Sequence, residues 1–274
     1  MPPATPIALT IAGSDSSGGA GIQADLKTFT AFGVYGAAVL TALTAQNTRG
    51  VQGVFEVPAD FVATQIESVL SDLAVGAVKT GMLATPAVVS AVARALNKWP
   101  ALPLVVDPVM VAAGGDPLLA PEAIETLRRE LIARADLVTP NLAEAARLVG
   151  AAEAATETEM AAQARAIAAL GARAVLVKGG HAQAPQAVDV LLFEDEIIRL
   201  ERPRLDTPHT HGTGCTLSAA IAALAARGVP WVEAVRRAKD FVWRGLEQGR
   251  RLGIGHGRGP LDHLFAIRAA PPPA

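Results

Sequence analysis

The stretch His211-Gly212-Thr213-Gly214-Cys215-Thr216 stands directly before an unbroken run of small and apolar residues, Leu217–Arg227. We predict that a helix, Thr213–Arg227, begins inside this glycine-rich loop. Such a loop turns several backbone N–H groups toward one point, and the positive end of the helix dipole adds to their field. The stretch therefore predicts an anion site, most often a site for phosphate. It also closes an alternation of strands and helices that sets the fold of the whole chain.

Cys215, the only cysteine of the chain, lies in the first turn of that helix. A helix N-terminus lowers the pKa of a thiol by roughly one unit or more. The position thus predicts a thiolate base beside the anion site, as a group-transfer enzyme needs. The alternative has equal weight on this segment alone, because Gly-x-Gly often precedes helices and most single cysteines are small core residues.

Composition excludes several classes of protein. The chain has 274 residues, 51% of them hydrophobic but only 4% aromatic, which predicts an aliphatic, alanine-rich core. A net charge of −2 argues against a nucleic-acid partner. A single cysteine excludes a disulfide framework and favours a reducing, cytoplasmic location. We find no signal peptide or membrane span. We predict one domain over residues 1–274, with disordered tails at 1–6 and 269–274.

Short apolar runs alternate with helical patterns from end to end. Strands are predicted at Ile7–Ala12, Gly36–Leu43, Val54–Val57, Ala77–Thr80, Leu104–Asp107, Leu137–Thr139 and Ala174–Lys178, with a hairpin at Val188–Phe193 and Ile197–Leu200. Helices are predicted at Gly21–Phe32, Ala59–Asp72, Thr85–Lys98, Pro121–Ile132, Asn141–Leu148, Glu157–Leu170, Thr213–Arg227 and Val232–Gly249. This alternation predicts an α/β fold with a mainly parallel central sheet and helices on both faces. Ligands of such sheets bind at the carboxyl ends of the strands.

The first predicted strand runs into the glycine-rich segment Gly13–Gly21, which opens a helix. Gly19-x-Gly21-x-x-Ala24 matches a dinucleotide fingerprint, so an NAD-dependent oxidoreductase is one alternative. The acidic residue expected about 20 positions later is missing, which argues against it. A backbone that wraps a small polar ligand fits better, with Asp25 facing into the site. The alternative for Asp25 is a solvated helix position.

Polar residues follow three further strands. Asp107 ends an apolar strand and stands before a proline. It is either a carboxylate that acts near magnesium or phosphate, or an Asp that simply starts a turn, which is common. Asn141 and Glu144 are three residues apart and share one face of a helical turn. They suit a hydrated magnesium ion, or else a capping box that needs no metal, and on this segment alone the capping box is favoured. Lys178 ends a strand beside two glycines, where its charge suits a nucleotide phosphate. We interpret His209 and His211 as local loop support.

These motifs, taken in order from about Ile7 to His263, resemble one family, the hydroxymethylpyrimidine/phosphomethylpyrimidine kinases of thiamine biosynthesis, within the ribokinase-like superfamily. The runs that carry the resemblance are Ala12–Lys27, Thr41–Thr48, Val78–Leu83, Val106–Met110, Thr139–Glu144, Val177–His181 and His211–Ser218. The resemblance implies a ribokinase-like three-layer sandwich. It also implies an enzyme that uses ATP and Mg²⁺ to phosphorylate 4-amino-5-hydroxymethyl-2-methylpyrimidine and then its monophosphate, and that forms a homodimer.

The same resemblance assigns roles by matching motif. The pyrimidine pocket would be lined by Gly13, Asp25, Gln46, Met82 and Val109. ATP would contact Lys178, Asn141 and Thr213. The metal would be held by Asp107, Asn141 and Glu144. The transferring phosphoryl group would lie in an anion hole formed by Gly212, Thr213, Gly214 and Cys215. Most sugar kinases of the superfamily have Asp where Cys215 stands, so the cysteine points to the pyrimidine and pyridoxal branch.

One departure from the family pattern concerns a predicted lid. After Asp107–Ala112 the family often carries Lys-Ser-Gly, whereas here the chain reads Ala113-Gly114-Gly115, so a lid lysine is missing. A pyridoxine or pyridoxal kinase of the same branch remains an alternative enzyme. A pyrimidine sensor without catalysis is an alternative from another class, against which the intact Gly212–Cys215 loop argues.

Overall fold

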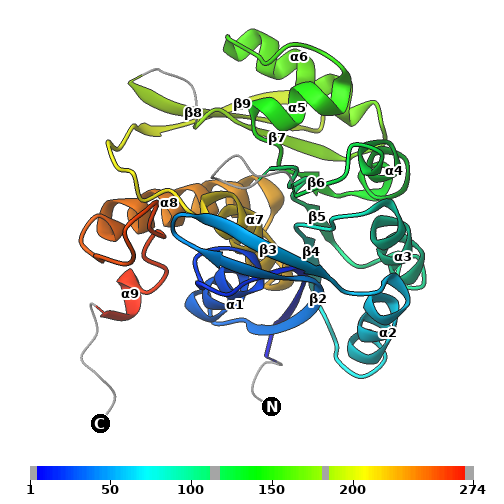
Figure 1. Ribbon diagram of the computed structural model, residues 1–274. Coiled ribbons are helices and arrows are strands. Elements are labelled where there is room, and N and C mark those ends of the chain that lie inside the picture. The colour runs from blue at the N-terminus through cyan, green and yellow to red at the C-terminus, as the bar shows by residue number, and fades with distance from the viewer. Residues whose placement is uncertain (1–4, 112–117, 181–184, 269–274) are drawn as a thin grey trace.

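A computed structural model describes residues 5–111, 118–180 and 185–268. Its strands are β1 (Ile7–Asp15), β2 (Tyr35–Asn47), β3 (Gly50–Glu56), β4 (Ala77–Thr80), β5 (Leu104–Val106), β6 (Leu137–Val138), β7 (Ala174–Lys178), β8 (Gln186–Phe193) and β9 (Glu196–Pro203). They form one sheet in the order β3-β2-β1-β4-β5-β6-β7-β8-β9 (Figure 1). The predicted lid around Ala113 and the outermost tails, 1–4 and 269–274, lie outside the described residues.

The centre of the sheet is parallel and both of its edges are antiparallel. Strands β2, β1, β4, β5, β6 and β7 pair in parallel, while β3, β8 and β9 run against their neighbours. The β8–β9 turn places Glu194 and Asp195 at φ of 49° and 65°, the left-handed pair that a tight hairpin needs. The parallel centre brings the carboxyl ends of β1, β4, β5, β6 and β7 to one edge, where polar side chains from several strands can meet.

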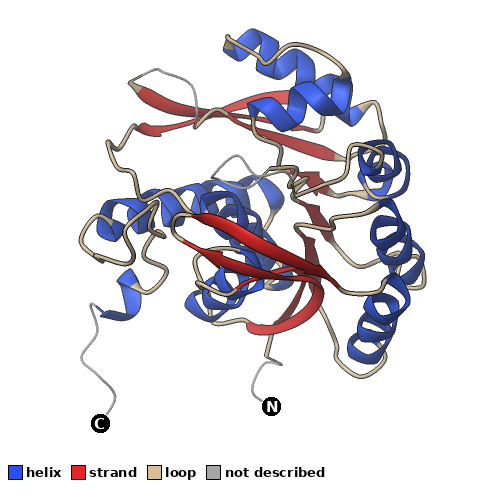
Figure 2. Cartoon of the chain, in the orientation of Figure 1, coloured by secondary structure: helices blue, strands red, loops and turns tan. Residues whose placement is uncertain are grey.

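Helices cover both faces of the sheet (Figure 2), as the sequence predicted. They are α1 (Gly21–Ala31), α2 (Ala59–Leu70), α3 (Pro86–Leu96), α4 (Ala123–Glu130), α5 (Leu142–Val149), α6 (Glu157–Ala168), α7 (Thr213–Ala226), α8 (Trp231–Gly249) and the short α9 (Phe265–Arg268). One apolar core lies between the sheet and α2 to α6, and a second lies between the sheet and α1, α7 and α8. Neighbouring strand residues alternate between them, so Leu9 enters the first core and Ala8 the second. The predicted α/β sandwich is confirmed.

Two element boundaries differ from the sequence prediction in ways that affect the site. Strand β2 continues past Leu43 to Asn47, because it pairs with β3 in an antiparallel ribbon rather than ending at a loop. Gln46 therefore lies on a strand instead of in a turn. The predicted helix Pro121–Ile132 is shorter, since α4 ends at Glu130 and a 3₁₀ turn, Ile132–Arg134, follows.

At the amino end, the carbonyl of Pro6 accepts a hydrogen bond from the N–H of Tyr35 at 2.9 Å, so the chain is tied to the sheet one residue before β1 begins.

Residues 257–263, which we call the C-terminal segment, tie three distant parts of the chain together. The N–H of Gly257 donates to Oγ1 of Thr48 at 3.1 Å, at the turn between β2 and β3. The carbonyl of Gly259 accepts from the N–H of His211 at 3.2 Å, at the entry to α7. The N–H of Asp262 donates to the carbonyl of Gly245 on α8 at 2.8 Å. The segment thus fixes the entry to α7 relative to the β2–β3 ribbon.

Candidate active site

Asp107 is the point where the polar residues of the sheet edge meet. It follows β5 directly and is buried. Its Oδ1 accepts hydrogen bonds from Oγ1 of Thr139 at 3.1 Å and from Nζ of Lys178 at 3.0 Å. Its Oδ2 accepts from Oγ of Ser218 on α7 at 3.2 Å. One carboxylate therefore connects the ends of β5, β6 and β7 with the first turns of α7, and the predicted proximity of Asp107 and Lys178 is observed.

Asn141 and Glu144 form a capping box at the start of α5. Oδ1 of Asn141 accepts from the N–H of Glu144 at 2.9 Å, and Oε2 of Glu144 accepts from the N–H of Asn141 at 2.7 Å. The reading that needs no metal is thus confirmed as the local role of this pair. Glu144 also lies 4.0 Å from Nζ of Lys178. Burial raises the pKa of Glu144 to about 7, nearby Asp107 adds to the rise, and the charge of Lys178 opposes it.

The oxygen ligands at this edge fit a hard cation only in part. Within residues 5–111, 118–180 and 185–268, no group of three or more His, Cys, Asp or Glu side chains gathers as a metal site. Asp107 and Glu144 still supply two buried carboxyl groups of the kind that Mg²⁺ prefers, and their proximity helps to raise the pKa of Glu144. Mg²⁺ commonly binds proteins through one or two carboxylates and completes its shell with water and substrate phosphates. The donor set fits that mode of binding.

The glycine-rich loop before α7 lies against Lys178 and Asp107. A Cβ added at Gly214 would stand 3.3 Å from Nζ of Lys178 and 3.7 Å from Oδ2 of Asp107. Gly212 has φ of 78°, and a Cβ there would come within 1.9 Å of the carbonyl oxygen of Gly19. No side chain in the described part of the protein caps the N-terminus of α7, and the first N–H groups of a helix have no intrahelical partner. The free donors of Gly214 and Cys215 therefore lie next to a buried ammonium group, as an anion hole requires.

The predicted low pKa of Cys215 is wrong. Burial raises the pKa of this thiol to about 11, and Asp25 and Asp107 add to the rise. The charge of Lys79 and a hydrogen bond from the N–H of Gly21 act in the opposite direction without reversing it. The helix N-terminus stabilises a thiolate by much less than the burial of the sulfur destabilises it. Cys215 is a neutral thiol at pH 7.

Asp25 is buried in an ion pair rather than solvated on its helix. Its Oδ2 accepts from Nζ of Lys79 at 2.7 Å and from Oγ1 of Thr10 at 2.6 Å, and both charged side chains have no exposed surface. Burial alone would lower the pKa of Lys79, but the adjacent Asp25 raises it, so the lysine stays charged. Oδ1 of Asp25 has no hydrogen-bond partner among the described residues. The sequence did not single out Lys79, although a lysine inside a buried strand needs a counter-charge.

His211 joins the entry of α7 to the loop after β1. Its Nε2 lies 2.8 Å from Oδ2 of Asp15, and both side chains are buried. His209 contributes from the same loop, because its Nδ1 accepts from the N–H of Gly259 at 3.2 Å. Both histidines support loops, but their partners, Asp15 and Gly259, are distant in the sequence, so the predicted local support is wrong in that respect. Asp15, which the sequence analysis did not assign, is the anchor of this arrangement.

The residues predicted for the pyrimidine pocket fall into three neighbouring groups. Met82 and Val109 belong to a small apolar cluster, and a Cβ on Gly13 would stand 3.0 Å from the Sδ of Met82. Gln46 lies beside His211 and Thr44 at the end of β2. Asp25 lies deeper, in the ion pair with Lys79. Gly13, Met82 and Val109 are thus brought together, while no described contact joins Gln46 or Asp25 to them.

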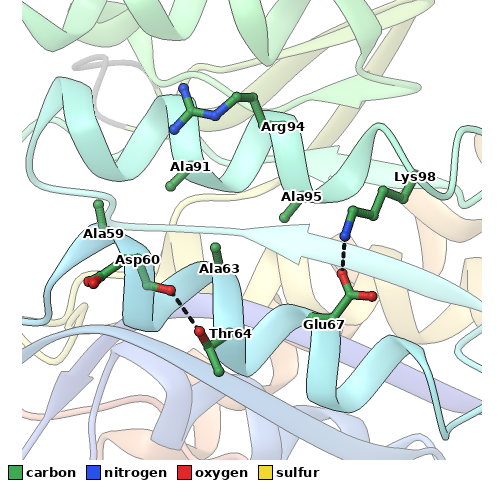
Figure 3. Close-up of a pocket in the computed structure, with 9 residues that line it drawn as sticks. All are labelled: Ala59, Asp60, Ala63, Thr64, Glu67, Ala91, Arg94, Ala95 and Lys98. Atoms are coloured by element: carbon green, nitrogen blue, oxygen red, sulfur yellow. Dashed lines mark hydrogen bonds and ion pairs between the residues drawn. The ribbon is translucent and has the colours of Figure 1, made fainter.

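A separate surface groove lies between α2 and α3 (Figure 3). Its floor is made of alanines, including Ala63 and Ala95, and its rim carries Asp60, Arg94 and an ion pair of 2.5 Å between Lys98 and Glu67. None of the residues predicted for the site lines it. The polar cluster around Asp107, and not this groove, is the candidate active site. No helix in the described part of the chain is long and apolar enough to cross a membrane.

Comparison with known proteins gives concordant matches. A family model described as phosphomethylpyrimidine kinase matches residues 15–262. The hydroxymethylpyrimidine/phosphomethylpyrimidine kinase of Rhizobium meliloti is 55% identical over 95% of this chain and 97% of its own length. An ADP complex of Bacillus subtilis pyridoxal kinase has a TM-score of 0.89 and 40% identity, covering 97% of this chain and 100% of that one. The pyridoxal kinase of Staphylococcus aureus with AMP-PCP and pyridoxal has a TM-score of 0.88 at 35% identity, covering 97% and 96%.

The buried pair of Asp25 and Lys79 predicts an asymmetric effect on stability. Lys79→Met should lower the free energy of unfolding by about 3–5 kcal/mol, because it leaves a buried carboxylate without its partner. Adding Asp25→Asn should recover most of the loss. Urea unfolding measures both, with Lys98→Met as the control, since that exposed ion pair should contribute less than about 1 kcal/mol. A cost for Lys79→Met as small as that of the control would contradict a stabilising buried pair.

His263 predicts a loss of stability in mild acid. Its Nε2 lies 2.9 Å from Oγ1 of Thr216, and burial, together with the charge of Lys27, lowers its pKa from 6.5 to about 4. Between those pH values the unfolded chain binds the proton and the folded one does not, so stability falls as the pH falls. Stability should drop by about 2 kcal/mol from this group between pH 7 and 5. Urea unfolding of His263→Gln should show a correspondingly smaller drop; identical pH profiles would exclude His263 as the cause.

Proposed function

The chain belongs to the phosphomethylpyrimidine kinase family, and we propose that it transfers the terminal phosphoryl group of ATP to 4-amino-5-hydroxymethyl-2-methylpyrimidine and then to the monophosphate so formed. This activity makes it a kinase of thiamine biosynthesis, as the sequence motifs predicted. The observation that supports it best is the meeting of Lys178, Asp107 and the α7 entry at Gly214. That meeting combines a fixed positive charge with free backbone donors, which are the two requirements of phosphoryl transfer.

The nucleotide side of the proposed site is formed by the loops after β6 and β7 and by α7. Lys178 would contact the ATP phosphates, with Asn141 and Thr213 beside them. Asp107 and Glu144 would hold Mg²⁺ through their carboxyl groups, together with the side-chain oxygen of Asn141. When bound, the metal would neutralise phosphate charge. Lys178 is paired with Asp107 at 3.0 Å, which would keep its ammonium group in place for an incoming phosphate.

The acceptor side is formed by the ends of β1, β2 and β4. Gly13, Met82 and Val109 would contact the faces of the pyrimidine, since their cluster is apolar. Gln46 would read the aminopyrimidine edge, because a carboxamide has both a donor and an acceptor. Asp25 would contribute through its Oδ1, which has no hydrogen-bond partner among the residues that the structure describes, or through the field that it shares with Lys79.

In the first transfer the hydroxymethyl oxygen attacks the terminal phosphorus, and the bond from that phosphorus to the ADP oxygen breaks. The hydroxyl proton must leave during attack. Because Cys215 is a neutral thiol at pH 7, only the small fraction of the protein that holds it as a thiolate would accept this proton. Developing negative charge on the transferred group would be met in the loop Gly212–Cys215, chiefly by the N–H groups of Gly214 and Cys215, since that of Thr213 already donates to the carbonyl of Thr210. In the second transfer the acceptor is already a phosphate oxygen, so no base is required.

A second candidate is a pyridoxal kinase, and the 40% identity and near-complete coverage of the Bacillus subtilis enzyme favour it over any other class. The missing ribose-binding acid still argues against an oxidoreductase.

We further propose a single domain over 1–274, a cytoplasmic location and a homodimer. The exposed apolar side chains of the β2–β3 ribbon and of α2, such as Phe55 and Phe61, which are 67% and 57% exposed, support a dimer interface there.

An acceptor assay tests the proposed function. ATP consumption should require Mg²⁺ and should be fastest with the hydroxymethylpyrimidine, slower with pyridoxine and absent with ribose. Addition of a chelator should stop turnover. A preference for pyridoxine would move the chain to the second candidate, and saturable NAD binding without ATP binding would contradict the kinase. Calorimetry on the same preparation gives both binding measurements.

The raised pKa of Cys215 predicts a distinctive pH dependence. With a thiol pKa of about 11, the thiolate fraction rises about tenfold per pH unit between pH 7 and 9. The rate of the first transfer should rise with it, whereas the second transfer should stay nearly flat. Cys215→Ala should remove the slope and slow the first transfer by about 10²–10⁴.

The measurement is product formation from each acceptor separately, the free alcohol and its monophosphate. Equal losses in both transfers for Cys215→Ala would limit Cys215 to shaping the anion hole. A slope that survives the substitution would assign the proton to another group.

A further inference from the structure

A hydrogen-bond network leads from the loop after β1 to the side chain of Gln46. It begins at Asp15, whose two oxygens accept from the N–H and Oγ of Ser17, from the N–H groups of Gly19 and Ala20, and from His211, at 2.7–3.1 Å. The pKa of Asp15 is lowered, because its hydrogen bonds to His211 and Ser17 outweigh the effect of burial. Asp15 is therefore an ionised carboxylate that can only accept.

The charge of Asp15 determines where His211 carries a hydrogen. A carboxylate oxygen 2.8 Å from Nε2 requires an N–H at that nitrogen. The Nε2 of Gln46 lies 3.4 Å from the same ring nitrogen. In that placement the amide N–H group of Gln46 faces the N–H of His211, and neither can accept from the other.

Thr44 imposes a second condition on the same amide, independent of His211. Its Oγ1 has a single hydrogen but lies within hydrogen-bonding distance of two acceptors, the carbonyl of Ser14 at 2.9 Å and Oε1 of Gln46 at 3.1 Å. While Oε1 of Gln46 occupies that place, the hydroxyl can donate to only one of these two oxygens and leaves the other without its hydrogen. A rotation of the carboxamide by 180° about its last side-chain bond exchanges its oxygen and nitrogen. That single rotation removes both conflicts, because the oxygen then faces the N–H of His211 and the nitrogen faces Oγ1 of Thr44.

We propose that Asp15, His211 and Thr44 fix the orientation of the Gln46 carboxamide, with its oxygen toward His211 and its nitrogen toward Thr44, and that this orientation determines substrate specificity. These three are positioning residues that act through Gln46. The contact between Gln46 and His211 is long at 3.4 Å, so it contributes more to the orientation of the amide than to the strength of the interaction. Strand β2 and the α7 entry thus act on one side chain.

The fixed orientation gives the ligand a donor and an acceptor at defined places. One N–H remains free on the Thr44 side of Gln46 and one lone pair remains free on the His211 side. A 4-aminopyrimidine offers an amino donor beside a ring-nitrogen acceptor and can match both. The 4-oxo analogue offers a carbonyl acceptor beside a ring N–H donor, so its pattern is reversed. A freely rotating amide would accept both ligands, whereas a fixed one rejects the analogue. This inference rests on the proposed role of Gln46 in the pyrimidine pocket.

The experiment compares kcat/KM for the 4-amino substrate and its 4-oxo analogue. The wild-type protein should prefer the amino compound by about 10² or more, because a reversed pattern leaves polar groups unpaired. Thr44→Val removes one of the two constraints and should lower this preference about tenfold. Thr44→Ser retains the hydroxyl and should retain the preference. An unchanged preference in Thr44→Val would overturn the proposal.

Magnetic resonance on the wild-type protein provides a test that needs no variant. With ¹⁵N-labelled glutamine, the side-chain amide protons of Gln46 should show nuclear Overhauser contacts to the methyl group of Thr44. Contacts to the ring protons of His211 instead would overturn the proposed orientation. Gln46→Ala separates this question from the proposed function. If that variant leaves the KM of the pyrimidine unchanged, Gln46 is outside the pocket and its assigned function fails, whatever its orientation.

Discussion

The carboxylate of Asp107 is the interaction on which the rest of the site depends. It receives hydrogen bonds from Thr139, Lys178 and Ser218, which come from the ends of two neighbouring strands and from α7. A buried carboxylate requires such donors, so its position dictates how closely α7 approaches the sheet. The free N–H groups at the helix entry are held beside Lys178 for the same reason. The geometry of the proposed anion site therefore follows from satisfying one buried charge.

Much of the fold was predictable because its signals are local. Apolar runs of strand length, turn residues and capping residues lie within a few positions of one another, and the positions of most elements follow from them. The length of β2 was not predictable in this way, because the strand continues to Asn47 only through pairing with β3. The roles of Asp15 and Lys79 were missed for a related reason. Each is defined by one partner, His211 or Asp25, far away in the sequence.

Cys215 shows where a local rule fails against its surroundings. Its place at a helix start argued for a reactive thiolate, and that argument used only the nearest turn of backbone. The surrounding protein removes water from the sulfur and brings two carboxylates near it, so the thiol is favoured. Asn141 and Glu144 show the reverse case, in which the capping pattern read from four residues is the observed one. A hydrogen bond between neighbours in the sequence depends on those few residues alone. The pKa of a side chain depends on every charge and on all the burial around it in the folded protein.

The C-terminal segment affects the order in which contacts form when the protein folds. Domains form as the ribosome delivers them, from the amino end onward. The sheet, α7 and α8 precede residues 257–263 in the chain, yet the entry of α7 is fastened by the carbonyl of Gly259 and the turn of the ribbon by the N–H of Gly257. The elements of the scaffold are therefore translated before the segment that fastens the loop preceding α7. These contacts form only after residues 257–263 have been translated, so a chain interrupted before them would lack the hydrogen bonds that fasten the entry of α7 and the turn of the ribbon.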